Sequence, residues 1–139
     1  MQLELIDIAL REHMLAMDDD FLPALVSDWS EYVVETKAGV AAWKLLPKDG
    51  DKTLVRFVVT AGLRWRREDK GSDAVATVEA EYGMLFVAPD EFETAEQNEE
   101  IAKQVVLAAW PYWRQDFTQM AVKASLPLMA IPVNPYQDE

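Results

Sequence analysis

Hydrophobic and polar residues alternate over several stretches of the chain, the pattern of half-buried β-strands. The clearest is Thr53–Arg67, in which every odd position from 55 to 65 is hydrophobic and Arg56, Thr60 and Arg64 fall between them. Residues 74–88 repeat the pattern in even phase. Glu79 and Glu81 lie on the polar side of this second strand, so we expect them to pair with arginines of the neighbouring strand.

Two further strands are predicted upstream. Residues 2–12 alternate with one phase slip at Leu5-Ile6, which indicates a β-bulge. Residues 31–46 are rich in β-formers and end at the turn-forming residues 47–51, which predicts a hairpin with the strand that follows. Between these strands, residues 14–28 form a long hydrophobic connection, for which a wrapped crossover and a short helix both remain open.

The period changes to about 3.6 residues from Thr94 onward, which predicts a long helix after the sheet. Thr94 and Gln97 have the spacing of a capping box. Pro111 lies inside the helical pattern and should kink the helix or make it restart. Three later prolines predict an extended C-terminal segment: Pro127, Pro132 and Pro135.

Composition limits the classes of function. The 139 residues are 50% hydrophobic and fit a single domain, residues 1–139, and the absence of cysteine argues against disulfides and thiolate metal sites. A net charge of −12 makes nucleic acid a poor partner. Acidic residues near the N-terminus and the lack of an apolar run of about 20 residues predict a cytoplasmic protein without membrane insertion.

Catalytic chemistry has little support in the sequence. His13 is the one histidine, and neither a Gly-x-Ser-x-Gly motif nor a phosphate-binding glycine loop occurs. We therefore expect no catalytic residue, metal or cofactor. A rival hypothesis places His13 and Asp18–Asp20 at the mouth of a pocket, as a small-molecule binder or an enzyme on a cone-shaped sheet-plus-helix fold. A module with one fixed protein partner is a third possibility.

The hydrophobic side chains exceed what one small sheet and one helix can cover. The surplus predicts an oligomer interface, a ligand groove, or both. It is formed by aromatic residues and methionines spread along the chain: Trp29, Tyr32, Trp43, Trp65, Trp110, Tyr112, Trp113, Phe117, Met120, Met129 and Tyr136.

The C-terminal part of the sequence resembles the SecB export chaperones. Residues 110–114 (WPYWR), 123–127 (KASLP) and 131–134 (IPVN) are similar to the C-terminal signature of that family, and the order of the predicted strands and helix agrees along nearly the whole chain. The resemblance implies an α+β fold, in which one long helix packs on one face of a four-stranded antiparallel sheet. It also implies a homo-oligomer, either a dimer or a tetramer built as a dimer of dimers.

The same resemblance implies a holdase that uses no ATP, binds unfolded polypeptides in hydrophobic grooves and serves protein export, with the SecA motor as a further partner. Four residues are then expected to contact clients: Trp29, Tyr32, Leu126 and Met129. Four others are expected in the oligomer interface: Trp110, Tyr112, Arg114 and Phe117.

Some positions depart from the family pattern. Lys123-Ala124 stands where the family has a basic residue and glycine, and too few residues follow Pro132 for the family's second helix. An acidic position of the last strand, part of the patch that the family presents to SecA, falls on Val78. A relative dedicated to one client, such as an antitoxin, therefore fits as well as a general export chaperone.

Overall fold

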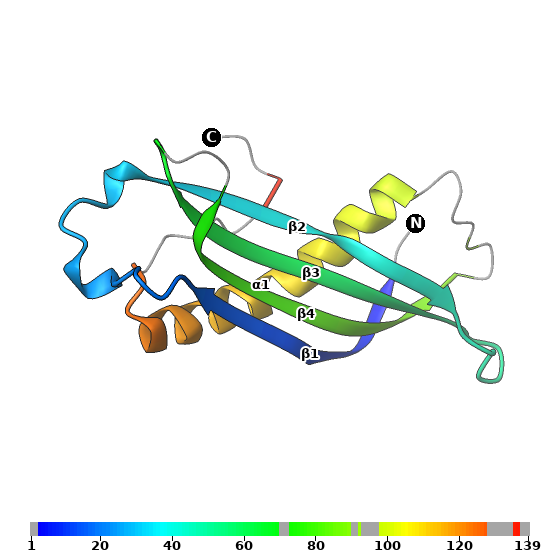
Figure 1. The fold of residues 1–139 in the computed structure, drawn as a ribbon. Helices are drawn as coiled ribbons and strands as arrows, with labels where there is room; N and C mark the ends of the chain where they lie inside the picture. The colour runs from blue at the N-terminus through cyan, green and yellow to red at the C-terminus, as the bar shows by residue number, and fades with distance from the viewer. Residues whose placement is uncertain (1–2, 70–72, 90–91, 93–97, 128–134, 137–139) are drawn as a thin grey trace.

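The computed structural model describes residues 3–69, 73–89, 92, 98–127 and 135–136. Four strands precede one long helix, which runs diagonally across the sheet (Figure 1). This confirms the predicted α+β class. In chain order the elements are β1 (Glu4–Met17), the short 3-10 helices η1 (Pro23–Leu25) and η2 (Trp29–Glu31), β2 (Tyr32–Leu45), β3 (Thr53–Arg67), β4 (Ala74–Ala88) and α1 (Asn98–Ala124).

The sheet is antiparallel throughout and has the strand order β1-β4-β3-β2. β3 and β4 occupy the predicted residues and pair from Thr53↔Ala88 onward. β1 extends five residues beyond the predicted end at residue 12, because its ladder with β4 continues to Met17↔Ala76. The register shift between Leu5 and Asp7 confirms the predicted bulge. A second shift, between Leu10 and Glu12, was not predicted.

The core lies between the sheet and α1. The inward positions of β3 and β4, which alternate along each strand, are almost fully buried, as are the helix residues that meet them. Trp65 stacks on Phe117 at a ring separation of 6.2 Å, and Trp113 packs against the same phenyl ring. The helix is continuous through Pro111, so it does not restart there. The predicted capping box at Thr94 and Gln97 lies outside the described residues.

The other face of the sheet, called the outer face below, carries charged side chains in pairs. Glu35 of β2 accepts hydrogen bonds from Arg64 (2.8 Å) and Arg66 (3.2 Å) of β3. Arg64, more than Arg66, lowers the pKa of the Glu35 carboxyl. Glu79 pairs instead with Lys37 at 2.7 Å. The expectation that arginines pair with Glu79 was therefore wrong.

The Lys37–Glu79 pair spans two strands because the residue between them is Gly62, which is opposite both in the register. A Cβ at Gly62 would lie 2.9 Å from the Cγ of Glu79. The bare backbone of β3 thus gives the glutamate room to reach β2.

No helix in the described part of the chain is long and apolar enough to cross a membrane.

Candidate functional site: the crossover groove

Residues 18–31 form a crossover that leads from β1 at one edge of the sheet to β2 at the other. The backbone N–H of Asp18 donates to Val75, and that of Phe21 donates to Asp18, which turns the chain away from the sheet. Asp28 caps η2: its carboxylate accepts from the N–H (3.0 Å) and the hydroxyl (2.6 Å) of Ser30, and both bonds lower its pKa. The crossover is therefore a wrapped connection that contains two short 3-10 helices, so it combines the two forms left open by the sequence.

Three aromatic rings pack together beneath this crossover. Phe21 lies 6.0 Å from Trp29 and 5.6 Å from Tyr32, and the Trp29 and Tyr32 rings are 5.3 Å apart. Phe21 is buried, while Trp29 and Tyr32 are half-buried and join the edge of the core. Such ring pairs stabilise a fixed arrangement beyond the area that they bury. The cluster thus holds the crossover against the edge of the core.

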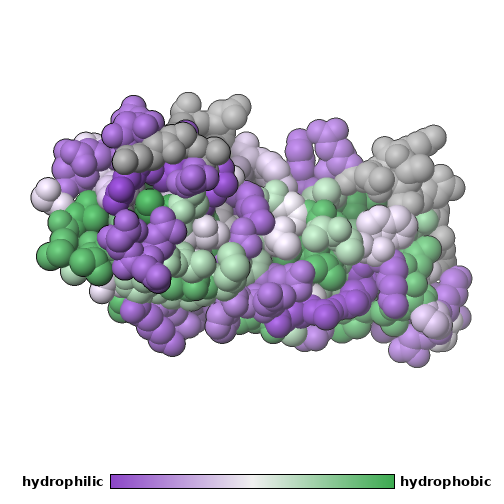
Figure 2. All heavy atoms as spheres, viewed as in Figure 1, coloured by the Kyte–Doolittle hydropathy of each residue, from purple (hydrophilic) through white to green (hydrophobic). Residues whose placement is uncertain are grey.

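Leucines on the outside of the crossover remain in solvent. Leu22 is 56% exposed and Leu25 is 76% exposed, the largest exposed fraction among the large hydrophobic residues described. Figure 2 shows hydrophobic surface gathered at the end of the molecule where the crossover lies. Isolated exposed leucines are common, but two on a loop that also holds an aromatic cluster form a contiguous hydrophobic surface.

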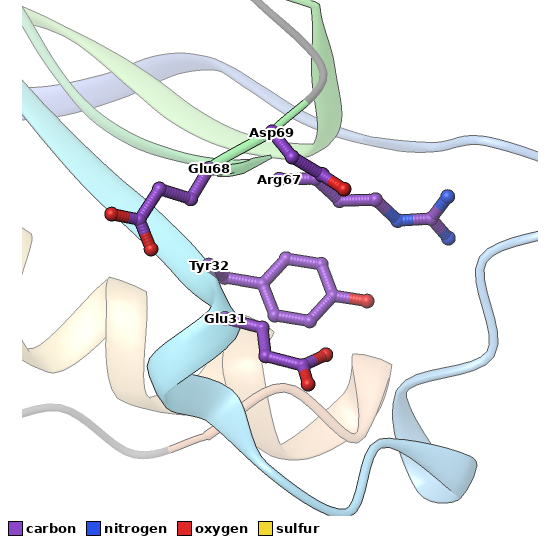
Figure 3. A pocket seen from close by; sticks show the side chains of 5 residues that line it. All are labelled: Glu31, Tyr32, Arg67, Glu68 and Asp69. Atoms are coloured by element: carbon purple, nitrogen blue, oxygen red, sulfur yellow. The ribbon is translucent and has the colours of Figure 1, made fainter.

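Two hollows open beside this cluster. One, of about 280 Å³, lies along the crossover and is lined by residues that include Phe21, Leu25 and Tyr32; we call it the crossover groove. The other, of about 640 Å³, is lined by Tyr32, Arg67 and three carboxylates, those of Glu31, Glu68 and Asp69 (Figure 3). Tyr32 and Arg67 line both hollows.

Arg67 is the cation shared by the two hollows. Its hydrogen bond with the Tyr32 hydroxyl raises the pKa of its guanidinium, and the charges of Asp20 and Asp69 add to this effect. The remaining charged residues that line the hollows are acidic. The chemistry available here is hydrophobic contact and hydrogen bonding at an acidic rim, with no nucleophile paired with a base.

The four expected client-contact residues have different positions. Tyr32 lines the crossover groove, and Trp29 packs against its ring without being one of the lining residues. Leu126 is 5% exposed and belongs to the core just beyond α1, so its side chain offers almost no surface to a client. Met129 lies outside the described residues. The sequence did not single out Leu25 or Arg67 as site residues. Leu25 could have been found, because a leucine in a proline-containing loop between two strands is a sign of an exposed hydrophobic contact.

Of the four expected interface residues, two are buried and two are exposed. Trp110 is 5% exposed and Phe117 is 1% exposed, because both point from α1 into the core of their own chain. Each side chain thus leaves little surface for a second chain, and their place in an oligomer interface stays a prediction. Tyr112 is 45% exposed and Arg114 is exposed, so these two are free to contact a neighbour.

The edge strand β1 presents hydrophobic surface that the sequence pattern did not indicate. Its exposed large hydrophobic residues are Ile6 (51%), Leu10 (44%), Met14 (41%) and Leu15 (38%). The two bulges hid this feature, since each one shifts the alternation by one residue. In the described sheet β1 pairs only with β4, so its other edge has free backbone groups.

A groove of about 400 Å³ lies between β1 and α1, and His13 and Asp116 are among the residues that line it. Asp116 accepts a 2.6 Å hydrogen bond from the hydroxyl of Tyr82, and burial together with this bond raises the pKa of Tyr82. Asp18 is five strand residues beyond His13, about 16 Å at the usual rise. The structure therefore does not bring His13 and Asp18–Asp20 together, and the described residues contain no group able to hold a metal ion.

Comparison with known proteins identifies the fold. No family model and no curated protein sequence matches the chain. Among solved structures, the Mycobacterium tuberculosis Rv1957 SecB-like chaperone, in complex with a ChAD peptide from the Rv1956 HigA1 antitoxin, superposes with a TM-score of 0.66 at 17% identity, covering 98% of this chain and 93% of that one. A putative pore-forming toxin from Bacteroides vulgatus gives a TM-score of 0.17, too low to indicate a shared fold. The chain has the fold of a SecB-like chaperone.

Proposed function

We propose that this protein is a holdase chaperone that binds unfolded polypeptides at the crossover groove. The observation that carries the proposal is the exposure of Leu22 and Leu25 beside the aromatic cluster of Phe21, Trp29 and Tyr32. An unfolded chain buries its own hydrophobic side chains against this surface. Because burial is non-directional, many sequences gain from it, and the acidic rim keeps the complex hydrated. The mechanism needs no cofactor and no ATP.

The oligomer belongs to the same proposal. The free edge of β1 and its exposed Ile6, Leu10 and Met14 need a cover, as does Tyr112 on α1. A second copy that pairs along β1 supplies backbone partners and buries these side chains in one step. A dimer formed in this way presents two crossover grooves, and a dimer of dimers presents four. Several weak grooves then hold one client strongly by multivalency.

Although the groove can accept many sequences, we propose that the protein serves a particular client and not general protein export. The Rv1957 structure contains a peptide from an antitoxin, which supports a client-specific form of the function over general protein export. The outer face, where the resemblance implies an acidic patch for SecA, supports it too, since Val78 is buried on the other face and carboxylates and cations are balanced. The charged residues of the outer face are Glu4, Asp7, Glu12, Glu35, Glu79 and Glu81 with Arg11, Lys37, Lys44, Arg56, Arg64 and Arg66.

The test is a matched pair of surface substitutions. Leu25→Ser and Val122→Ser each remove one exposed hydrophobic side chain, 76% and 61% exposed, from the crossover and from α1. Neither should change the free energy of unfolding by more than about 0.5 kcal/mol. Uptake of a reduced, permanently unfolded protein is measured by chromatography with light scattering. We expect Leu25→Ser to weaken uptake severalfold and Val122→Ser to leave it unchanged; equal effects would contradict the crossover groove as the client site.

The small-molecule hypothesis is tested by His13→Ala in the same assay. His13 lines the β1–α1 groove and not the crossover groove, so its loss should leave client holding intact. The folded form of the client serves as the negative control and should not be taken up. If folded and unfolded forms bind equally, the holdase proposal is wrong.

A further inference from the structure

The middle of the outer face carries a cluster of cations that the client groove does not use. Arg56 on β3 is opposite Lys44 on β2 in the register, and Arg11 lies in the second bulge of β1. The Cδ of Arg11 is 2.8 Å from the position that a Cβ of Gly83 would take, and the Nη2 of Arg56 is 3.8 Å from the same point. Two arginine side chains thus converge over the bare backbone of Gly83. We call Arg11, Lys44, Arg56 and Gly83 the Gly83 site.

These cations differ from the others on the same face. Arg64 and Arg66 pair with Glu35, and Lys37 pairs with Glu79. By contrast, Arg11, Lys44 and Arg56 form no ion pair with any residue that the structure describes. Like charges on neighbouring strands repel each other, and an added anion relieves that repulsion. The site therefore favours a negatively charged occupant.

Hydrophobic residues flank the cations on the same face, together with the carboxylates of Asp7 and Glu81, neither of which forms an ion pair with them. Val58 is opposite Gly83 in the β3–β4 register, and Leu85 is opposite Arg56; both are half-buried. The described helix packs on the other face of the sheet, so these side chains stay open to a partner. A site that joins guanidinium groups to aliphatic side chains fits an extended peptide in which acidic and hydrophobic residues alternate.

We propose that the Gly83 site docks an acidic, hydrophobic segment of a partner protein. Carboxylates of that segment accept bidentate hydrogen bonds from Arg11 and Arg56, and its hydrophobic side chains contact Val58 and Leu85. Nucleic acid is disfavoured because the three cations of the site do not form the continuous basic track that follows a phosphate backbone. The site lies on the opposite face of the sheet from the core that supports the crossover, so a docked partner and a client can bind at the same time.

The experiment measures fluorescence anisotropy of a labelled peptide in which glutamate alternates with valine, with the full-length chain. The peptide should bind, a version with lysine for glutamate should not, and the double variant Arg11→Ser/Arg56→Ser should weaken binding by about tenfold. Arg64→Ser, which removes an outer-face arginine already paired with Glu35, is the matched control and should change binding little. Arg11→Lys/Arg56→Lys keeps the charge and should restore part of the affinity.

Three results would overturn the proposal: equal binding of the glutamate and lysine peptides, equal loss in the Arg64→Ser control, or stronger binding of single-stranded DNA of the same charge. Thermal unfolding of each variant shows that the fold is kept. Uptake of an unfolded client is measured alongside, and the double variant should take it up normally. If the peptide does not bind, client uptake still tests the holdase proposal. If client uptake fails, peptide binding still tests the Gly83 site.

Discussion

The central strands β3 and β4 and the region formed by β1 with the crossover are both rich in hydrophobic residues, yet they use them differently. In β3 and β4 the inward side chains from Val55 to Trp65 and from Ala76 to Phe86 are at most 4% exposed. In β1 and the crossover, Ile6, Leu10 and Leu25 are 51%, 44% and 76% exposed. Hydrophobic content alone thus does not define the core. The central strands hold the chain together, and the peripheral region offers surface to other chains.

The largest expected effect is on stability, and it separates two neighbouring residues of α1, one buried and one exposed. Trp113 is 1% exposed and packs on Phe117, while Tyr112 is 45% exposed. We expect Trp113→Ala to lower the free energy of unfolding by about 3–5 kcal/mol through lost burial and a residual cavity. Tyr112→Ala should change it by less than about 1 kcal/mol. Urea unfolding followed by circular dichroism measures both, and similar losses would show that the exposed face of α1 also carries the fold.

The next effect is on assembly and not on folding. Ile6→Lys places a charge at the exposed edge of β1, where a second copy is proposed to pair. We expect the mass from light scattering to fall to that of a smaller species, with circular dichroism unchanged. Leu45→Lys is the matched control: Leu45 is also 51% exposed but lies on β2, the opposite edge strand. If the two variants lose assembly equally, or neither does, β1 is not the interface edge.

The same contrast explains which parts of the structure could be predicted from sequence. The alternation in β3 and β4 is unbroken, so their bounds and buried faces follow directly from it. In β1, bulges near Ile6 and Arg11 shift the phase twice, and no local signal marks the second. Trp29 and Tyr32 were predicted at the crossover, but the packing of Phe21 against both rings follows from how the crossover folds back, which no local pattern specifies. Likewise, the helix pattern alone does not tell core residues such as Trp110 from interface residues.

A smaller effect concerns the contact between β4 and α1. Tyr82→Phe removes the 2.6 Å hydrogen bond from the tyrosine hydroxyl to Asp116, which should lower the free energy of unfolding by about 1–2 kcal/mol. Burial, together with the bond to Asp116, raises the pKa of Tyr82 above its ordinary value near 10, so the folded chain keeps a proton that the unfolded chain loses. Wild-type stability is thus retained below pH 10 and falls above it. Urea unfolding across this range should show a shallower fall for Tyr82→Phe; equal slopes would contradict the assignment.

The smallest effect tests whether the outer face tolerates change as the peripheral region does. Gly62→Ala introduces a methyl group 2.9 Å from the Cγ of Glu79 and 3.2 Å from the carbonyl oxygen of Val78. The glutamate must turn away and lose its ion pair with Lys37, and the central strands must adjust slightly. Together these changes should lower the free energy of unfolding by about 1 kcal/mol. Lys37→Ala removes the same exposed ion pair without crowding and should lower stability by at most about 0.5 kcal/mol. Urea unfolding separates the loss of the ion pair from the crowding by the added methyl group. If Gly62→Ala is no less stable than Lys37→Ala, the space above β3 is not confined and the glycine is not needed for the Lys37–Glu79 contact.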